Sequence, residues 1–177
     1  MKYNVTTSIL AVGAFALATG FVTQADAAYA YNSVLATFGA PTPTTHDCVF
    51  VNSRPSQPYS VVSMGGMQGC PSVGTPGFWD VPLQLNAGSN STVNAYATFY
   101  QRTSNTVEAR LLVLHGDGTY LGGTAFKTSS STGLVEKYLG AASVPYYGSA
   151  IGQFQIPADS NTTDPNRGYS FRTYYAY

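Results

Sequence analysis

The sequence predicts an all-β protein, a single antiparallel β-sandwich or jelly roll of about eight strands with one disulfide. Short runs rich in Val, Ile, Thr, Tyr and Phe alternate with clusters of Gly, Pro, Asn, Asp and Ser, which is the pattern of strands and turns. No stretch has a convincing helical period, although a short helical turn is allowed around residues 133–143. Two cysteines, Cys48 and Cys70, supply one bridge.

The N-terminus predicts export. Lys2 is followed by an apolar run over residues 8–22 and by the small-residue site Ala25-Asp26-Ala27. This order is typical of a secretory signal peptide, so we expect cleavage before Ala28 and loss of residues 1–27. The apolar run is shorter than the roughly 20 residues of a spanning helix, and no second long run follows. The expected location is secreted, extracellular or periplasmic, with no membrane span after cleavage.

The charge-free segment 28–45 is expected to form an extended N-terminal segment and linker. It begins with strand-like residues and ends in a Pro-Thr run. Residues 46–177 are expected to form the β-sandwich domain, because the mature chain of about 150 residues is long enough for one core. Within the two parts, the strand pattern falls on residues 46–53, 59–64, 78–85, 91–102, 106–115, 119–128, 133–139, 149–157 and 168–177.

Two neighbouring strands show the pattern most clearly. In residues 92–101, apolar and polar side chains alternate with a period of two, which places them on opposite faces of a sheet. The apolar face is Val93, Ala95, Ala97 and Phe99, and the other face is Asn94, Tyr96, Thr98 and Tyr100. Residues 107–114 become continuously apolar at their end, which predicts burial on both faces there.

The cysteine pair is interpreted as a structural disulfide between Cys48 and Cys70. In an exported chain such a bridge stabilises the fold by roughly 3 kcal/mol in the chain-entropy model. A redox-active pair would favour Cys-x-x-Cys spacing and a helix N-terminus, and the sequence has neither.

Composition narrows the partners. Charged residues are 9% of the chain, where about 25% is usual, and the net charge is zero. No nucleic-acid partner is therefore expected. Aromatic residues are 14% of the chain, which argues against disorder. A tyrosine-rich surface with little charge suits extracellular β-proteins, glycan binders and assembling subunits.

The sequence contains no catalytic, metal or cofactor motif that we can identify. Gly-x-Ser-x-Gly is absent, and the two histidines, His46 and His115, lie far apart in the sequence. The oxygen-rich stretch 159–166 is interpreted as a polar loop before the last strand, with calcium binding as the alternative. We therefore expect no catalytic residues, no metal and no cofactor, and an enzyme with an unrecognised site stays an alternative.

Four residues are expected to bind ligand: Trp79, Asp80, Tyr96 and Tyr100. An exposed Trp79 beside Asp80 would suit a sugar, because aromatic faces stack on pyranose rings and carboxylates accept hydrogen bonds from hydroxyl groups. The alternative, that Trp79 is a core residue near the disulfide, is favoured because tryptophan is highly buried on average.

Three short motifs carry a family resemblance: Asp47-Cys48 opening the domain, Gly69-Cys70-Pro71 closing an early loop, and Phe154-Gln155-Ile156-Pro157 before the final strand. In this layout the chain resembles secreted bacterial β-sandwich proteins of unknown function. The resemblance implies bacterial export and a sandwich, and it supplies no active-site residues.

The first functional hypothesis is a secreted, non-enzymatic binding module for a glycan or cell-surface ligand. The second is a structural subunit that self-associates by strand addition through residues 28–43. The third is an outer-membrane β-barrel, suggested by the alternating aromatic run over residues 169–177. The proline-rich first half lacks the alternating segments of about ten residues that a barrel needs.

Overall fold

The computed structural model describes residues 29–42, 48–52, 59–65, 76–85, 91–161 and 163–176. The signal peptide predicted over residues 1–27 lies outside the described residues, as do His46 and Cys70. Cys48 is buried. Cleavage before Ala28 and the bridge between Cys48 and Cys70 therefore stay predictions.

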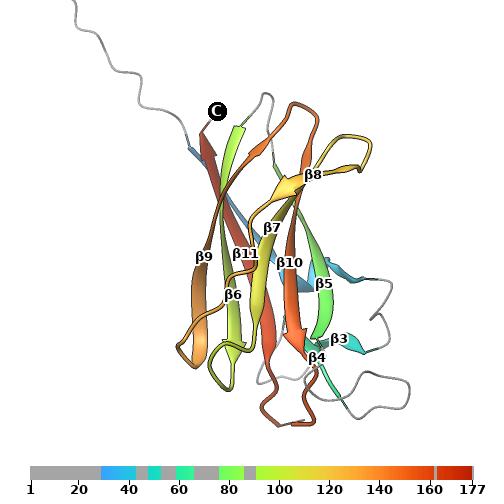
Figure 1. Ribbon diagram of the computed structural model, residues 1–177, viewed down its shortest axis with the longest axis vertical. Coiled ribbons are helices and arrows are strands. Elements are labelled where there is room, and N and C mark those ends of the chain that lie inside the picture. The colour runs from blue at the N-terminus through green and yellow to red at the C-terminus, as the bar shows by residue number, and fades with distance from the viewer. Residues whose placement is uncertain are drawn as a thin grey trace, which may run out of the picture.

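Two antiparallel sheets make up the described fold, which confirms the all-β class and the sandwich (Figure 1). Sheet A contains β1 (Tyr29–Leu35), β3 (Val49–Asn52), β4 (Ser60–Ser63), β6 (Ser91–Gln101), β9 (Gly133–Val144) and β11 (Arg167–Ala176). Its order is β3-β4-β11-β6-β9, and β1 also pairs with β11.

Sheet B contains β2 (Ala40–Pro41), β5 (Pro76–Leu83), β7 (Glu108–Leu114), β8 (Tyr120–Gly123) and β10 (Ser149–Pro157), in the order β2-β5-β10-β7-β8. The described residues thus form eleven strands, where about eight were expected. The difference comes partly from β1 and β2, which lie in the stretch expected to be a leading segment and linker.

That N-terminal stretch joins the two sheets. β1 pairs with β11 over seven residues in sheet A, and the short 3₁₀ turn η1 (Ala36–Phe38) leads into β2, which pairs with β5 in sheet B. Figure 1 shows the blue β1 leading to the segment beside β5. At Gly39 the chain passes so close to β5 that only glycine fits, because a Cβ there would lie 2.2 Å from the Asp80 carbonyl oxygen.

Residues with a period of two fill the core from both sheets. In β6 the four residues predicted to face inward are all fully buried, which confirms the faces of residues 92–101. The prediction for the end of β7 is wrong: Leu111 and Val113 are buried, but Leu112 and Leu114 are partly exposed. Apolar side chains there face outward as well as inward, so a continuous apolar run did not mean burial on both faces.

Two phenylalanines interlock at the centre of the core. Phe154 on β10 and Phe171 on β11 have ring centroids 4.3 Å apart. A Cβ at Gly152 would lie 2.5 Å from the Phe171 ring, and one at Gly168 would lie 2.6 Å from the Phe154 ring. Each ring therefore packs on a glycine of the opposite sheet, which is how the two sheets approach closely at this point.

The helical turn allowed around residues 133–143 is not formed. These residues belong to β9, which pairs with β6 along its whole length apart from one irregularity. No helix in the described part of the chain is long and apolar enough to cross a membrane.

Candidate functional site

The outer face of sheet A carries a row of four tyrosines, one from each of four adjacent strands. The order across the sheet is Tyr31 on β1, Tyr174 on β11, Tyr96 on β6 and Tyr138 on β9. Their ring centroids are 5.9, 6.1 and 5.0 Å apart in that order. We call these four residues the tyrosine row.

Strand alternation and register place the row. Tyr96 lies between the buried Ala95 and Ala97, and Tyr174 lies between the buried Thr173 and Tyr175, so both point away from the core. The antiparallel register sets Tyr31 opposite Tyr174 and Tyr138 opposite Tyr96. The row stays open to solvent at both ends, where Tyr31 is 71% exposed and Tyr138 is 44% exposed.

Polar groups accompany the rings. The Arg172 guanidinium lies over the Tyr96 ring, 4.8 Å from its centroid, and Arg172 Nη2 donates to Glu136 Oε2 at 3.0 Å. The Tyr138 hydroxyl donates to Asn94 Oδ1 at 2.8 Å. One surface therefore carries aromatic rings, hydroxyls, an amide, a guanidinium and a carboxylate. The positive charge of the guanidinium and the negative charge of the carboxylate offset each other.

The hydroxyl of Tyr174 stays protonated over the neutral range. Burial raises the pKa of this hydroxyl, and the neighbouring Tyr96 raises it further. A protonated phenol can both donate and accept hydrogen bonds. The row therefore offers uncharged polar groups between its apolar ring surfaces.

Tyr100, one of the expected ligand-binding residues, is engaged elsewhere on β6. Its hydroxyl donates to Asp164 Oδ2 at 2.6 Å, and this hydrogen bond is the main reason that its pKa is raised. The buried Arg167 places its guanidinium 4.6 Å from the Tyr100 ring and donates from Nη2 to Asp164 Oδ1 at 2.7 Å. Tyr100 thus fixes the loop before β11.

The same loop was the alternative calcium site. Asp164 is held by Arg167, and Asp159 is held by Arg102 at 3.2 Å. Both carboxylates are therefore neutralised by arginines, as in a structural polar loop. Among the described residues, no three His, Cys, Asp or Glu side chains gather as metal ligands would.

Trp79 belongs to the core, which confirms the favoured alternative for its burial. It is 5% exposed, and its Nε1 donates to the Ala36 carbonyl at 2.7 Å. The indole offers no open face to a ligand, so the expectation that Trp79 binds ligand is corrected. Its role is to hold η1 against sheet B.

Asp80 lies on the outer face of sheet B, on the opposite side of the sandwich from Tyr96. Gln153 Nε2 donates to Asp80 Oδ1 at 2.7 Å, and Arg110 Nε donates to Gln153 Oε1 at 2.8 Å. Burial raises the pKa of the Asp80 carboxyl, and the contacts with Gln153 and Arg110 partly offset this rise. The four expected residues therefore do not form one site, and only Tyr96 lies in the tyrosine row.

Sequence reasoning missed the other three members of the row. Tyr31 lay in the presumed leading segment, and Tyr138 lay in the allowed helical turn. Tyr174 lay in the final alternating run, but on its other face. The usable signal was the period of two in each strand, and the missing information was the register that aligns the strands.

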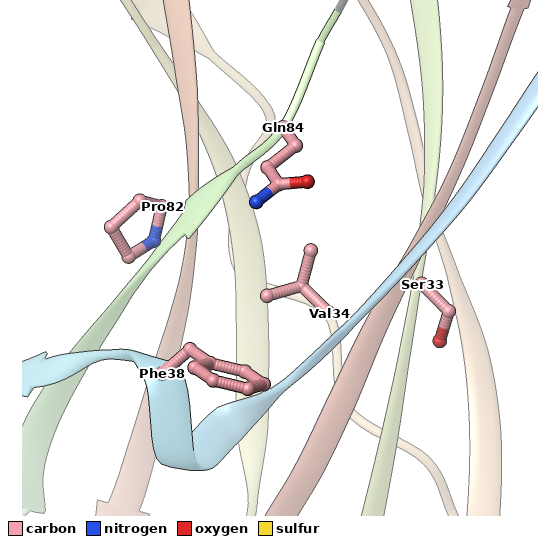
Figure 2. A pocket seen from close by; sticks show the side chains of 5 residues that line it. All are labelled: Ser33, Val34, Phe38, Pro82 and Gln84. Atoms are coloured by element: carbon pink, nitrogen blue, oxygen red, sulfur yellow. The ribbon is translucent and has the colours of Figure 1, made fainter.

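A groove lies beside β1, between the two sheets. Its volume is about 320 Å³, and it is lined by Ser33, Val34, Phe38, Pro82 and Gln84. Figure 2 shows the Val34 side chain pointing into the space between Phe38, Pro82 and Gln84, while the Ser33 side chain points to the other side of β1. Phe38 is 72% exposed at the mouth of this groove.

Several solved structures resemble this fold. A family 35 carbohydrate-binding module from Clostridium thermocellum is 12% identical, covers 83% of this chain and 98% of its own, and has a TM-score of 0.44. CBM35 from Paenibacillus barcinonensis is 12% identical, with coverage of 81% and 97% and a TM-score of 0.46. Chitosan-binding module 1 from a chitosanase/glucanase of Paenibacillus sp. IK-5 is 17% identical, with coverage of 78% and 96% and a TM-score of 0.32.

No protein-family model and no curated protein matches the sequence. The structural neighbours are carbohydrate-binding modules by name. Likeness at these identities and TM-scores does not locate a site, so the site has to be argued from this chain's own residues.

Proposed function

We propose that this protein is a secreted, non-enzymatic module that binds a glycan through the tyrosine row on the outer face of sheet A. The observation that carries the proposal is the row itself: four tyrosines from four adjacent strands, with open ends, on a face where Arg172 and Glu136 form an ion pair.

The chemistry of the row suits a sugar chain. Sugars present apolar C–H faces that pack on aromatic rings, and hydroxyls that exchange hydrogen bonds with phenols, amides and charged groups. Asn94 supplies an amide, and Arg172 and Glu136 supply the charged groups. Because Arg172 and Glu136 neutralise each other, a neutral glycan is favoured over an acidic one.

The dimensions of the row suit an oligosaccharide. Neighbouring strands are about 4.8 Å apart, so four strands carry the row over about 14 Å. That length exceeds a single sugar ring. The signal peptide predicted over residues 1–27 supports the proposal, because it would deliver the module to a compartment where cell-wall and extracellular glycans are found.

Glycan-array binding and depletion by insoluble polysaccharides test the proposal, with residues 28–177 as the protein. We expect binding to at least one neutral glycan. In the double variant Tyr96→Ala/Tyr138→Ala the affinity should fall about tenfold to a hundredfold, because each ring contributes on the order of 1 kcal/mol.

The matched control is Tyr120→Ala, which removes an exposed tyrosine from β8 in sheet B. It should leave the affinity unchanged. The proposal fails if neither assay detects a glycan ligand, or if Tyr120→Ala lowers the affinity as much as the double variant does.

A further inference from the structure

The outer edge of β1 differs from the other sheet edges in the described structure. β1 pairs with β11 along one side, and no described strand pairs with its other side. An unpaired edge presents a row of backbone N–H and C=O groups to any strand that can approach. Proteins usually protect such edges with charges, prolines, bulges or very short strands.

The other edge strands carry these protections. β9 contains Glu136 and Lys137 and has a break in its register with β6. β8 has four residues and a break in its register with β7. β2 has two residues, one of them Pro41, and β3 has four residues.

β1 carries none of them. Its seven residues, Tyr-Ala-Tyr-Asn-Ser-Val-Leu, contain no charge and no proline, and their register with β11 is unbroken. The exposed Tyr31, Ser33 and Leu35 lie on its outward face. Beside the edge lies the groove of Figure 2, where the Phe38 ring is open to solvent. Apolar surface therefore accompanies an unprotected edge.

We propose that the outer edge of β1 pairs with β1 of a second copy of this chain, antiparallel about a two-fold axis, so that the two A sheets become continuous. In a two-fold pair the same strand faces itself, so charged residues at facing positions would repel each other. β1 has no charged residue, so this repulsion does not arise. Tyr31 and Leu35 each lie two residues from Ser33 along the strand. A two-fold axis at Ser33 therefore sets Tyr31 of each copy opposite Leu35 of the other copy.

The inner side of β1 provides a precedent for this contact. There Tyr31 already stacks on Tyr174 of an antiparallel neighbour, with the ring planes 28° apart. The outer side would repeat that arrangement with Leu35 of the second copy as the neighbour. The joined sheet would carry the tyrosine rows of both copies on one face. If the rows bind glycan as proposed above, the dimer is bivalent, and the pairing itself does not depend on that function.

Sedimentation velocity of residues 28–177 tests the pairing, together with the variants Ser33→Glu and Ser33→Lys. The unchanged protein should form a dimer as the protein concentration is raised to about 100 µM. Each variant should sediment as a monomer, because the axis brings two like charges together. An equimolar mixture of the two variants should sediment as a dimer again, because glutamate then faces lysine.

The control is Ser143→Glu, an exposed position on β9 at the opposite edge of sheet A, which should leave the dimer intact. Far-ultraviolet circular dichroism of each variant should match that of the unchanged protein. A monomer at every concentration overturns the proposal. So does a dimer that persists in both Ser33 variants, because it would use another surface. Loss of the dimer without recovery in the mixture overturns the two-fold pairing as well.

Discussion

On both sheets every second side chain of a strand points to the outer face, but the side chains on the two outer faces make different contacts. On sheet B, Asp80, Gln153 and Arg110 hydrogen-bond to one another in a row across three strands. Gln153 points away from the core and is still only 6% exposed. On sheet A, the tyrosine row keeps open ends, where Tyr31 is 71% exposed and Tyr138 is 44% exposed.

The difference comes from what lies beside each face. After β8 the chain continues along β7, where Thr124 N donates to the Leu111 carbonyl and Lys127 bridges to Ala109. This brings the Phe126 ring 4.3 Å from the Arg110 guanidinium and within 6.3 Å of the Phe78 ring. Aromatic side chains thus shield the polar row of sheet B. Sheet B therefore uses its outer polar groups to hold its strands together, whereas we propose that the outer face of sheet A binds a ligand.

The largest expected effect that tests this comparison is on sheet B. Gln153→Ala leaves the Asp80 carboxylate and the Arg110 guanidinium without their shared partner. We expect the free energy of unfolding to fall by about 1–3 kcal/mol, with no change in the affinity of the tyrosine row for glycan. Urea unfolding and the glycan-binding assay measure the two quantities. If affinity falls while stability is unchanged, the roles of the two faces are reversed.

A smaller effect concerns pH. Because burial raises the pKa of Asp80 in the folded protein, this group favours folding below the unfolded pKa of about 3.9 and loses that contribution as pH rises through the folded pKa. Asp80→Asn removes the ionisation. The stability of the variant relative to the unchanged protein should therefore increase between about pH 3.5 and pH 7.

Thermal unfolding across that pH range measures the change. Glu136→Gln on sheet A is the matched control, because Glu136 is half-exposed and pairs with Arg172 at the surface. A difference for Asp80→Asn that is constant with pH would contradict the assignment.

The smallest effect is expected for Arg172→Gln. Both partners of the pair between Arg172 and Glu136 are about half-exposed, so its loss should cost less than about 1 kcal/mol of stability. Glycan affinity should fall by a few-fold, because the guanidinium over the Tyr96 ring is lost. Arg172→Lys should keep more of the affinity than Arg172→Gln does. Titration calorimetry in low salt and high salt separates the charge from the packing.

The sequence predicted the elements of this fold better than their assembly. All nine expected strand ranges contain strands, because the period of two and the turn residues are local signals. Residues 28–45 were expected to begin as an extended, strand-like segment, but β1 and β2 were not assigned to the sandwich. Their pairing partners, β11 and β5, are distant in sequence. Burial of Trp79 was favoured correctly from the general behaviour of tryptophan.

Of the four residues in the candidate site, the sequence predicted only Tyr96. Asp80 and Tyr96 looked equivalent in sequence, since each lies on a strand beside apolar residues. Sheet assignment separates them, and it depends on which strands pair, which is not encoded in the local pattern. The tyrosine row needs four strands in register, so no single segment could reveal it.

The pairing of β1 with β11 sets Tyr29 opposite Ala176, so the first and last described strands lie side by side in sheet A. This contact has one of the greatest sequence separations in the fold, so its loop-closure entropy is among the largest that folding has to overcome. It also brings the two ends of the described chain to one corner of the molecule, where a circular permutant could join them with a short linker.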